Sequence, residues 1–311
     1  MSDDQVFTEG PSEDTPVDEH PLADEVQADD SGAGAPSGVT VVVNDVPVEI
    51  AAGETLLGAL SQAGIDTPTI CYNEHLTPVN ACRVCVVELE GSRTLVPACS
   101  REATDGMVVH TDTERVRHSR KMVLEFLGSG VNLDQAVDIL EWMDEYGADP
   151  TRYGPDAARM DETPKVQDDL YIRDYDRCVL CYKCVQACGD QAQHTFAISV
   201  SGRGFDARIS TEFDTELPDS ACVYCGNCIE VCPTNALQFK SEFDLRAAGD
   251  WQPEEQTVTR TVCSYCGVGC NLNLHVQDNQ IVKVMSPSDH DVTNGNLCIK
   301  GRFGWTYVNT P

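Results

Sequence analysis

The chain is poor in positive charge and has no long apolar run. Its 311 residues include 21 Lys and Arg against 51 Asp and Glu, so the formal net charge is −30. Binding to nucleic-acid phosphates needs clustered Lys and Arg, so no nucleic-acid partner is expected. No stretch reaches the roughly 18 apolar residues of a membrane span. No basic segment with an apolar run opens the sequence, as it would in a secretory signal. We therefore expect a cytoplasmic protein.

Lysine is scarce even among the few basic residues, with 6 Lys against 15 Arg. An acid excess with little Lys suggests a halophile, in whose salty cytoplasm screening shortens the range of self-repulsion. The alternative is an ordinary acidic protein with an acidic tail. Residues 1–38 contain no Lys or Arg. They cannot bury enough apolar surface to offset the entropy of ordering, and are predicted to form a disordered acidic tail.

Cysteine is the residue whose placement carries chemistry, because all 16 cysteines fall into four sets of four. The sets are Cys71, Cys82, Cys85, Cys99; Cys178, Cys181, Cys184, Cys188; Cys222, Cys225, Cys228, Cys232; and Cys263, Cys266, Cys270, Cys298. Reduced cysteines in a cytoplasmic protein are metal ligands or redox groups. Thiolates are also the usual ligands of iron–sulfur clusters. A disulfide framework is the alternative explanation for so many cysteines.

The second and third sets share the spacing C-x2-C-x2-C-x3-C, which is typical of two-cluster ferredoxins. In such proteins the fourth cysteine of each motif ligates the other cluster. The spacing therefore predicts one [4Fe-4S] cluster on Cys178, Cys181, Cys184, Cys232 and another on Cys188, Cys222, Cys225, Cys228. Zinc is the alternative, but its sites more often pair two C-x2-C motifs across a longer gap.

The first set, C-x10-C-x2-C-x13-C, lies in a segment with a recognisable family pattern. Cys82-Arg83-Val84-Cys85, followed by Val86-Val87-Glu88 and Gly91, resembles the [2Fe-2S] domain of three enzyme groups. These are respiratory NADH dehydrogenase large subunits, iron-only hydrogenases and NAD-linked formate dehydrogenases. The resemblance implies a β-grasp ferredoxin domain that holds one [2Fe-2S] cluster. Strands expected at 39–43, 46–50 and 84–89, with a helix at 56–63, agree with that fold. Structural zinc is the alternative.

Those relatives often carry a further [4Fe-4S] cluster held by one histidine and three cysteines. Here residues 131–135 read Val-Asn-Leu-Asp-Gln, without the ligand His and Cys, so we expect that cluster to be absent. Two helices are predicted within 113–147, the second capped by Asn132 with Gln135 at the capping-box position. His110 and His118 are interpreted as surface or packing residues.

The fourth set, C-x2-C-x3-C-x27-C, marks a second resemblance. The run from Thr261 to Leu272, with Cys298-Ile299-Lys300-Gly301-Arg302, resembles the N-terminal [4Fe-4S] domain of molybdenum and tungsten bis-pterin oxidoreductases. Formate dehydrogenase alpha subunits have the most similar pattern. By that resemblance Cys263, Cys266, Cys270 and Cys298 hold a [4Fe-4S] cluster. Lys300 would then lie between this cluster and a pterin, as an electron relay. Strands are expected at 257–262, 272–276 and 281–284.

The expected fold is α+β, built from a series of small cluster domains. The predicted parts are the tail at 1–38, a [2Fe-2S] β-grasp domain at 39–111, helices and linker at 112–169, a 2[4Fe-4S] ferredoxin domain at 170–241, a linker at 242–256, and a truncated bis-MGD oxidoreductase [4Fe-4S] domain at 257–311.

The resemblance implies the electron-transfer portion of a formate dehydrogenase alpha subunit. One [2Fe-2S] and three [4Fe-4S] clusters, about 14 iron ions, would relay electrons from a molybdenum or tungsten bis-MGD site. That site and its catalytic Cys or selenocysteine, His and Arg are expected on a pterin-binding catalytic part, in a separate chain or in missing sequence. A flavin/NAD subunit or a ferredoxin would accept the electrons. Two alternatives are a stand-alone multi-cluster carrier and an electron-input subunit of an NADH dehydrogenase or hydrogenase complex.

Overall fold

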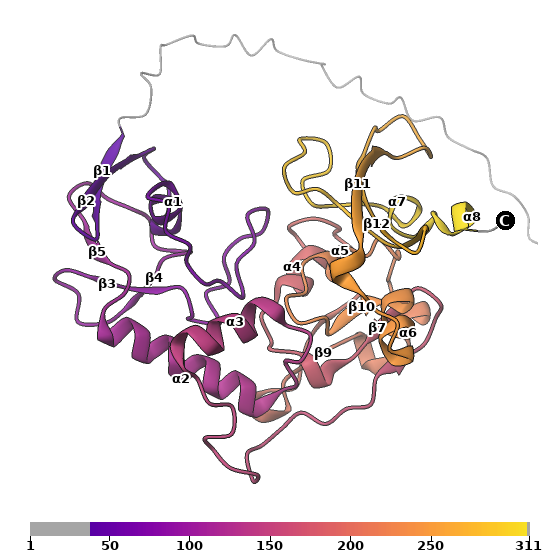
Figure 1. Ribbon diagram of the computed structural model, residues 1–311, viewed down its shortest axis with the longest axis horizontal. Coiled ribbons are helices and arrows are strands. Elements are labelled where there is room, and N and C mark those ends of the chain that lie inside the picture. Colours follow the sequence, from indigo (N-terminus) through magenta and orange to yellow (C-terminus); the bar gives the residue numbers. More distant parts are fainter. Residues whose placement is uncertain (1–37, 310–311) are drawn as a thin grey trace, which may run out of the picture. The chain divides into compact units, whose positions relative to one another are not determined.

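The computed structural model describes residues 38–309, and Figure 1 shows their helices and strands in order along the chain. The acidic tail expected at 1–38 lies outside the described residues, apart from Gly38. Within 38–309, no helix has the length and apolar character needed to cross a membrane. The described chain mixes short strands and helices, as the α+β prediction requires.

The first part is a mixed sheet with one helix packed on it. Its strands are β1 (Val39–Val43), β2 (Val46–Ile50), β3 (Val86–Leu89), β4 (Val96–Pro97) and β5 (Val108–His110), in the order β2-β1-β5-β3-β4. Strands β1 and β5 run parallel, and the other neighbours are antiparallel. The strands expected at 39–43 and 46–50 form a hairpin, in which Asn44 and Asp45 adopt φ of 46° and 69°, the left-handed backbone of a tight two-residue turn. Helix α1 (Leu56–Gln62) buries Leu56 and Leu60 against the sheet.

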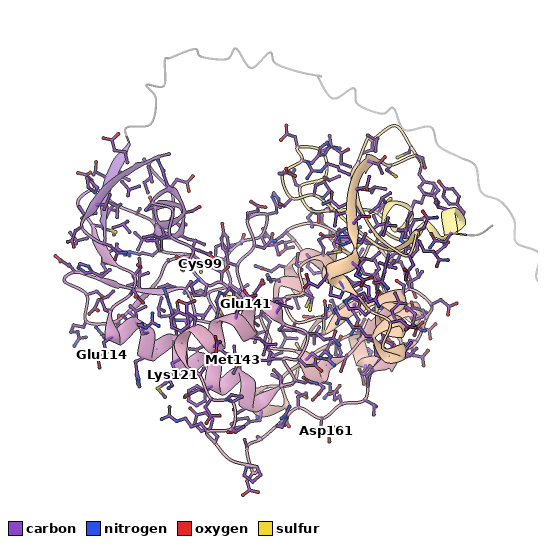
Figure 2. The ribbon with its side chains drawn as sticks, viewed as in Figure 1. Cys99, Glu114, Lys121, Glu141, Met143 and Asp161 are labelled. Atoms are coloured by element: carbon purple, nitrogen blue, oxygen red, sulfur yellow. The ribbon has the colours of Figure 1, made fainter. Side chains whose placement is uncertain are left out.

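The second part consists of the two predicted helices, α2 (Glu114–Gly130) and α3 (Val137–Tyr146). The Thr113 hydroxyl caps α2 by accepting from Val116 N at 3.2 Å, and Gly147 ends α3 with φ of 62°. The two helices pack on each other, with Met143 of α3 against Gly128 of α2 (Figure 2).

The predicted cap at Asn132 is wrong. Helix α3 starts five residues later, after Ala136, whose side chain makes no capping bond. The Asn132 carboxamide instead accepts from Asp134 N at 3.0 Å. Asparagine side chains compete with helix formation in this way when they close a local turn.

Burial on these two helices does not follow the polarity of the side chains. Phe126 and Leu140 are exposed by 54% and 42%, whereas the charged Arg120 and Glu125 are buried at 4% and 1%. Phe126 stacks on Tyr153 instead, with ring centroids 5.0 Å apart. Arg120 reaches the core because its guanidinium donates to Tyr146 Oη at 2.8 Å and to Val86 O at 3.1 Å. Buried charge of this kind does not follow from hydrophobic periodicity.

The third part carries the second and third cysteine sets on two short helices that follow tight loops. Its strands are β6 (Lys165–Val166), β7 (Tyr171–Arg173), β8 (Ser199–Ser201), β9 (Arg208–Ser210) and β10 (Leu237–Phe239). Its α-helices are α4 (Lys183–Cys188), α5 (Asn227–Glu230) and α6 (Lys240–Ala248), and its 3₁₀ turns are η1 (Tyr175–Arg177), η2 (Gly204–Asp206), η3 (Glu212–Asp214) and η4 (Leu217–Asp219). Strands β10, β7 and β6 form one sheet, and β8 pairs with β9.

The last part is a three-stranded antiparallel sheet followed by two short helices. It begins after η5 (Pro253–Glu255) and contains β11 (Thr257–Val262), β12 (Asn271–Gln277), β13 (Gln280–Met285), α7 (Ile299–Phe303) and α8 (Thr306–Asn309). All three predicted strands are confirmed.

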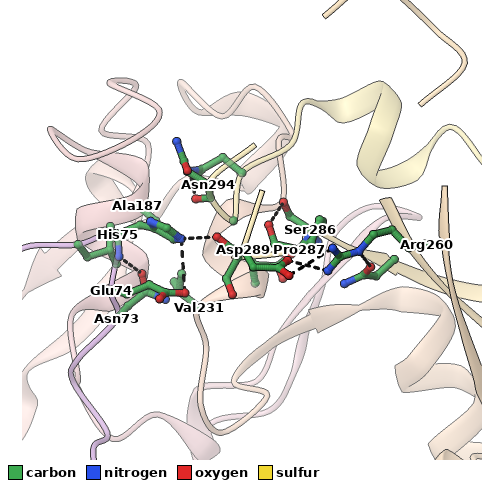
Figure 3. A pocket seen from close by; sticks show the side chains of 16 residues that line it. Asn73, Glu74, His75, Ala187, Val231, Arg260, Ser286, Pro287, Asp289 and Asn294 are labelled. Atoms are coloured by element: carbon green, nitrogen blue, oxygen red, sulfur yellow. Dashed lines mark hydrogen bonds and ion pairs between the residues drawn. The ribbon is translucent and has the colours of Figure 1, made fainter. Parts of the chain in front are cut away.

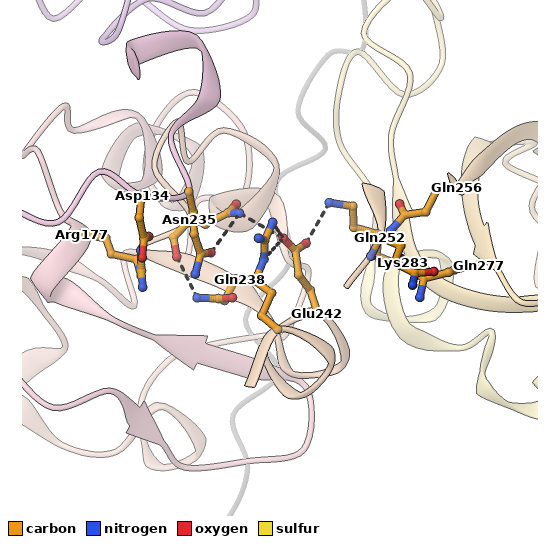
Figure 4. Close-up of polar contacts among 11 residues, drawn as sticks. Asp134, Arg177, Asn235, Gln238, Glu242, Gln252, Gln256, Gln277 and Lys283 are labelled. Carbon is orange, nitrogen blue, oxygen red and sulfur yellow. Dashed lines mark hydrogen bonds and ion pairs between the residues drawn. The ribbon is translucent and has the colours of Figure 1, made fainter. Parts of the chain in front are cut away.

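The linker expected at 242–256 is helical in its first residues, because α6 continues to Ala248. The cause is the buried Glu242, whose carboxylate accepts from Lys283 Nζ of β13 at 2.8 Å and from Arg246 Nη2 at 2.7 Å (Figure 4). A paired carboxylate can be buried where an unpaired one cannot. Glu242 therefore ties the end of the third part to the sheet of the last part.

Candidate metal centres

The second and third cysteine sets lie on two loops with the same backbone design. Left-handed φ values recur at Leu180 (51°) and Tyr182 (64°) in one loop, and at Tyr224 (56°) and Gly226 (73°) in the other. These positions curl the chain, so that successive cysteines can face a common point. Helices α4 and α5 then begin directly after the loops and carry the next cysteines inward.

Each of these loops closes a cavity with a cysteine from the other motif. Cys178, Cys181 and Cys184 line one cavity together with Cys232, which comes from the end of the third set. Cys222, Cys225 and Cys228 line a second cavity together with Cys188, which ends the second set. Leu237 of β10 lines both cavities, so the two are neighbours. These eight cysteines thus line two neighbouring cavities, four to each, and every cavity combines three cysteines of one set with the last cysteine of the other.

The electrostatics of the thiols follow the same grouping. Burial raises the pKa of Cys178 to about 12 and that of Cys181 to about 11, and the negative charge of Cys232 adds to both shifts. Burial also raises the pKa of Cys222 and of Cys225, with Cys188 as a contributing charge. Thiols in such surroundings favour the neutral form unless a positive group binds the thiolates.

The first cysteine set is gathered at one side of the first sheet. Cys82 N donates to Cys71 Sγ at 3.4 Å, and Ala98 N donates to Cys85 O at 3.2 Å, which holds the segments around Cys85 and Cys99 together. A hydrogen bond from Cys82 lowers the pKa of Cys71, and one from Cys99 lowers the pKa of Cys85. Cys71, Cys85 and Cys99 are buried.

The first set also adjoins the second. Cys71 and Cys181 belong to one hydrophobic cluster, together with Val84, Leu124 of α2 and Ile139 of α3. Helices α2 and α3 therefore pack around this junction. Of the two histidines nearby, His110 pairs with Glu90 at 3.2 Å, and His118 is exposed.

The fourth set is the most open of the four. Cys263 is buried and Cys270 is half-buried, whereas Cys266 and Cys298 are exposed. Cys263 N donates to Cys270 O at 2.7 Å, and this bond closes the loop between β11 and β12. Burial raises the pKa of Cys270, and the other three cysteines contribute to the shift, so all four are near one another.

Lys300 is exposed on α7, two residues after Cys298. It lines a cavity of about 230 Å³ with Tyr265, Trp305 and Tyr307. No cysteine lines this cavity. The side chain is therefore accessible beside the most open cysteine set, as a residue in contact with a further cofactor would have to be.

Arg302 lies inside the quoted motif, but our sequence interpretation gave it no role. Its side chain is fully buried and donates to Glu230 Oε2, to Val284 O at 3.1 Å and to Cys225 O at 3.4 Å. A Cβ added at Gly226 would lie 2.6 Å from Arg302 Cγ, so only glycine fits there. Arg302 thus joins the helix after Cys298 to the loop of the third set. What distinguishes Arg302 from other arginines is its burial, and burial cannot be read from the sequence.

A polar cavity of about 630 Å³ is lined by no cysteine, although Ala187 and Val231, the neighbours of Cys188 and Cys232 in sequence, do line it (Figure 3). The loop after Cys71 and the segment after β13 both line it, and His75 Nε2 contacts Ser288 O across it at 2.9 Å. Arg260 donates to Asp289 at 2.6 Å. Each charged side chain that lines this cavity already has a partner within the described chain.

The residues present fit iron–sulfur clusters. Within residues 38–309, no three His, Cys, Asp or Glu side chains come close enough to hold a single metal ion. The cysteines of the second and third sets instead surround the two cavities. Tyr175 lines the cavity of Cys178, and Arg173 lines the cavity of Cys222. The Tyr175 hydroxyl and two nitrogens of Arg173 are buried and have no hydrogen-bond partner within residues 38–309. Thiolate donors around a space that also has unpaired donors suit a sulfide-containing cluster.

Three family models match the cysteine-bearing segments. Residues 37–114 match a 2Fe-2S iron-sulfur cluster binding domain. Residues 169–238 match the ferredoxin-like domain of NADH-quinone oxidoreductase subunit 3, and residues 256–310 match the molybdopterin oxidoreductase Fe4S4 domain. One 2Fe-2S domain and domains of the 4Fe-4S type are therefore present.

Known proteins are similar to most of this chain. A subunit of an NADH-quinone oxidoreductase from Rhizobium meliloti is 32% identical over 281 residues, which are 88% of this chain and 32% of that protein. A provisionally named formate dehydrogenase of Staphylococcus haemolyticus is 28% identical over 299 residues, 83% of this chain and 30% of that protein. The chain thus spans about a third of the length of the curated relatives that it matches.

A solved structure supports the fold. The crystal structure of an NAD+-reducing [NiFe]-hydrogenase in the H2-reduced state matches 65% of this chain and 87% of its own, with a TM-score of 0.56 and 24% identity. The domain matches and the relatives show that the chain carries iron–sulfur domains of the molybdopterin oxidoreductase superfamily. These domains make up a multi-cluster electron-transfer module of the kind shared by NADH-quinone oxidoreductases, hydrogenases and formate dehydrogenases.

Proposed function

We propose that this chain is the electron-transfer portion of a formate dehydrogenase. Formate is oxidised to carbon dioxide at a molybdenum or tungsten bis-MGD site on a pterin-binding partner, with release of a proton and two electrons. The chain passes the electrons to an acceptor such as a flavin/NAD subunit or a ferredoxin. The observation that carries the proposal is the combination of a molybdopterin-type cluster domain with two cavities lined by four cysteines each.

The proposed ligands are those predicted from spacing and resemblance. Four sites are proposed, on the segments 39–111, 170–241 and 257–311, and the segment 112–169 holds none. A [2Fe-2S] cluster is bound by Cys71, Cys82, Cys85, Cys99; [4Fe-4S] clusters are bound by Cys178, Cys181, Cys184, Cys232, by Cys188, Cys222, Cys225, Cys228, and by Cys263, Cys266, Cys270, Cys298. The β-grasp description of the first segment belongs to this proposal. Its support is the sheet order, with α1 packed on the sheet.

Contacts between the sites support an order for the relay. Arg302 joins the segment after Cys298 to Cys225, so the fourth site is next to the site with Cys225. Leu237 lines both ferredoxin cavities, so those two sites follow each other. Cys181 and Cys71 share one hydrophobic cluster, so the [2Fe-2S] site comes last. The proposed path therefore runs from the exposed fourth set through two buried sites to the first set.

The chain's own residues have three tasks along this path. The thiolates bind the clusters, which accept and release single electrons when present. Lys300, exposed beside Cys298, contacts the pterin of the partner and relays electrons to the fourth site. Buried side chains such as Tyr171, Leu124 and Phe303 exclude water between the sites. A low local dielectric strengthens the effect of each nearby charge on cluster potentials.

The test combines the chain with a pterin-binding catalytic partner and follows the clusters by EPR. Formate should reduce all four clusters in the complex, and formate with the chain alone should reduce none. Lys300→Met should slow cluster reduction by formate without changing the iron content. Reduction of the clusters by formate in the absence of a pterin partner would contradict the proposal.

A second candidate is an electron-input subunit of an NADH-quinone oxidoreductase type of complex. It is favoured by the relative from Rhizobium meliloti, which has the higher identity of the two curated relatives. The same assay separates the two functions. Under this second candidate, NADH with a flavin-bearing partner reduces the clusters, and formate with a pterin-bearing partner does not.

We also propose that the chain works in a salt-rich, haloarchaeal cytoplasm. A net charge of −30 on 311 residues repels itself strongly in dilute buffer. Molar salt shortens the screening length to about 3 Å and removes most of that repulsion. The melting temperature of the holoprotein should therefore rise steadily as KCl is raised to molar concentration. Equal stability without salt would refute this part of the proposal.

A further inference from the structure

Arg173 is a buried cation without a counter-ion in this part of the chain. It ends strand β7, between Ile172 and Asp174, and only 2% of its surface is exposed. One nitrogen, Nη2, donates to the Gln167 side-chain oxygen, which also accepts from Leu217 N at 3.1 Å. The remaining nitrogens, Nε and Nη1, are buried and have no hydrogen-bond partner within residues 38–309.

The neighbouring charges do not neutralise this guanidinium. Asp174 follows Arg173 directly in sequence, but its carboxylate accepts from Arg177 Nε at 2.7 Å. The ring of Tyr175 lies beside Arg173, with the guanidinium carbon 6.0 Å from the ring centroid. The positive charge of Arg173 and a loose contact with its side chain both oppose the rise in the pKa of Tyr175 that burial causes. This contact does not satisfy the guanidinium, because neither Nε nor Nη1 makes a well-formed hydrogen bond within residues 38–309.

Arg173 lines the cavity that Cys188, Cys222, Cys225 and Cys228 also line. The apolar residues around it, among them Ile198 and Leu217, are themselves buried. Buried charges are normally paired, because an isolated one is strongly disfavoured in an apolar interior. A cavity lined by four cysteines and an unpaired guanidinium therefore suits an anionic group that binds the thiolates and accepts N–H bonds.

We propose that Arg173 is the buried counter-ion of the iron–sulfur cluster in this cavity, to which Nε and Nη1 donate hydrogen bonds. The proposal rests on the proposed cluster ligands Cys188, Cys222, Cys225 and Cys228. Arg173 is a positioning residue in this role, because it sets the charge around the cluster and does not itself carry electrons. Neither the cysteine spacing nor the family resemblance assigns it.

The consequence is a raised reduction potential for this one cluster. Reduction adds a negative charge to a group that is already anionic with its four thiolates. A nearby cation and two N–H donors stabilise the reduced form more than the oxidised form, and both effects are strong in a low-dielectric site. Arg302 also approaches this loop, but its charge is paired with Glu230. Arg173 therefore supplies the uncompensated charge at this site.

The experiment is an EPR-monitored redox titration of the full chain with its clusters. The signal of the cluster in question is identified as the one that Cys222→Ser removes or alters. In Arg173→Gln that cluster should become harder to reduce by about tenfold at a given potential, a shift of about 59 mV for a one-electron couple. Arg173→Lys keeps the charge and should shift the potential less. The reduction potentials of the other clusters should not change.

Arg120→Gln is the matched control, because Arg120 is also buried at 4% and also has an unpartnered Nε, but it contacts Val86 near the first cysteine set. An equal shift of the same signal in this variant would show that loosened packing, and not charge, is responsible, and it would overturn the inference. An unchanged potential in Arg173→Gln would overturn it too.

A second measurement does not depend on any variant folding. In protein labelled with nitrogen-15 arginine, pulsed EPR of the reduced cluster should show coupling to a guanidinium nitrogen and to exchangeable protons. Clusters without such coupling contradict the role of Arg173 and leave the proposed function intact. A purified protein with little iron would instead contradict the proposed function.

Discussion

Replacement of Arg302 with methionine should detach the last segment from the ferredoxin segment. The substitution keeps most of the apolar stem and removes the charged head. The head is fully buried and pairs with Glu230, whose side chain is 13% exposed. Glu230 would keep one backbone donor, Ser286 N at 2.9 Å, and lose its counter-ion. Breaking a buried ion pair by removing one partner costs about 3–5 kcal/mol.

That free energy translates into a measurable change in local opening. About 3 kcal/mol corresponds to an increase of roughly 100-fold in the open fraction, since each 1.4 kcal/mol is a factor of ten. Hydrogen exchange followed by mass spectrometry reads this opening in the peptide that contains α7. The amides of Arg302 and Gly304 are protected there by bonds to Cys298 O at 3.0 Å and Lys300 O at 2.9 Å. Their exchange should accelerate by about that factor.

The double variant provides the control. Glu230→Gln combined with Arg302→Met leaves no uncompensated carboxylate, so α7 should exchange more slowly than in Arg302→Met alone. Exchange at the wild-type rate in Arg302→Met would refute the reasoning. Strictly additive effects of the two substitutions would also refute it, because they would show that the two charges do not interact.

Two further predictions concern the junction around α6 and β12. Glu242→Ala should cost about 2–4 kcal/mol of stability, because it removes the ion-pair partner of Lys283. Asp244→Ala on the same helix should cost less than about 1 kcal/mol, because the pair of Asp244 with Lys240 is exposed. Equal shifts of the urea midpoint in the two variants would contradict this. His275 has its pKa lowered to about 4, first by burial and then by the charge of Lys283, so the unfolded chain binds more protons than the folded one between about pH 4 and 6.5. Stability should therefore fall as pH drops through that window, by about 1–2 kcal/mol after allowance for the partial exposure of His275. His275→Gln should abolish this part of the loss. Urea midpoints measured at pH 7.5 and pH 5 check the prediction.

Local structure was largely predictable where it depends on neighbours in sequence. The first two strands, the two helices within 113–147 and the three final strands all follow from short-range preferences and alternation. The cap predicted at Asn132 failed for the same kind of reason, because a competing local turn captured the side chain. Short-range preferences allow Asn132 either to cap a helix or to close a local turn, and the tertiary packing of α3 selects between the two conformations.

Burial of charge was not predictable from the sequence. Arg120, Glu125, Glu242 and Arg302 are all buried in the described chain, and none stands out among the charged residues of an acidic protein. Phe126, an apolar residue on the same helix as Arg120, is exposed instead. Each buried charge depends on a partner that is distant in sequence, such as Glu230 for Arg302 or Lys283 for Glu242. Long-range pairing of this kind has no periodic signature.

The sequence by itself determined which residues are candidates to hold iron. Cysteine spacing within a loop sets how many thiolates can face one point, so the four sets and the proposed exchange of ligands were predicted without coordinates. Only the tertiary structure decided what surrounds them. It brings Cys71 beside Cys181, joins Cys225 to the segment after Cys298 through Arg302, and leaves Arg173 unpaired in a cavity lined by cysteines. Ligand geometry is a local property of the chain, whereas the charge and proximity that govern electron flow arise when distant segments pack together.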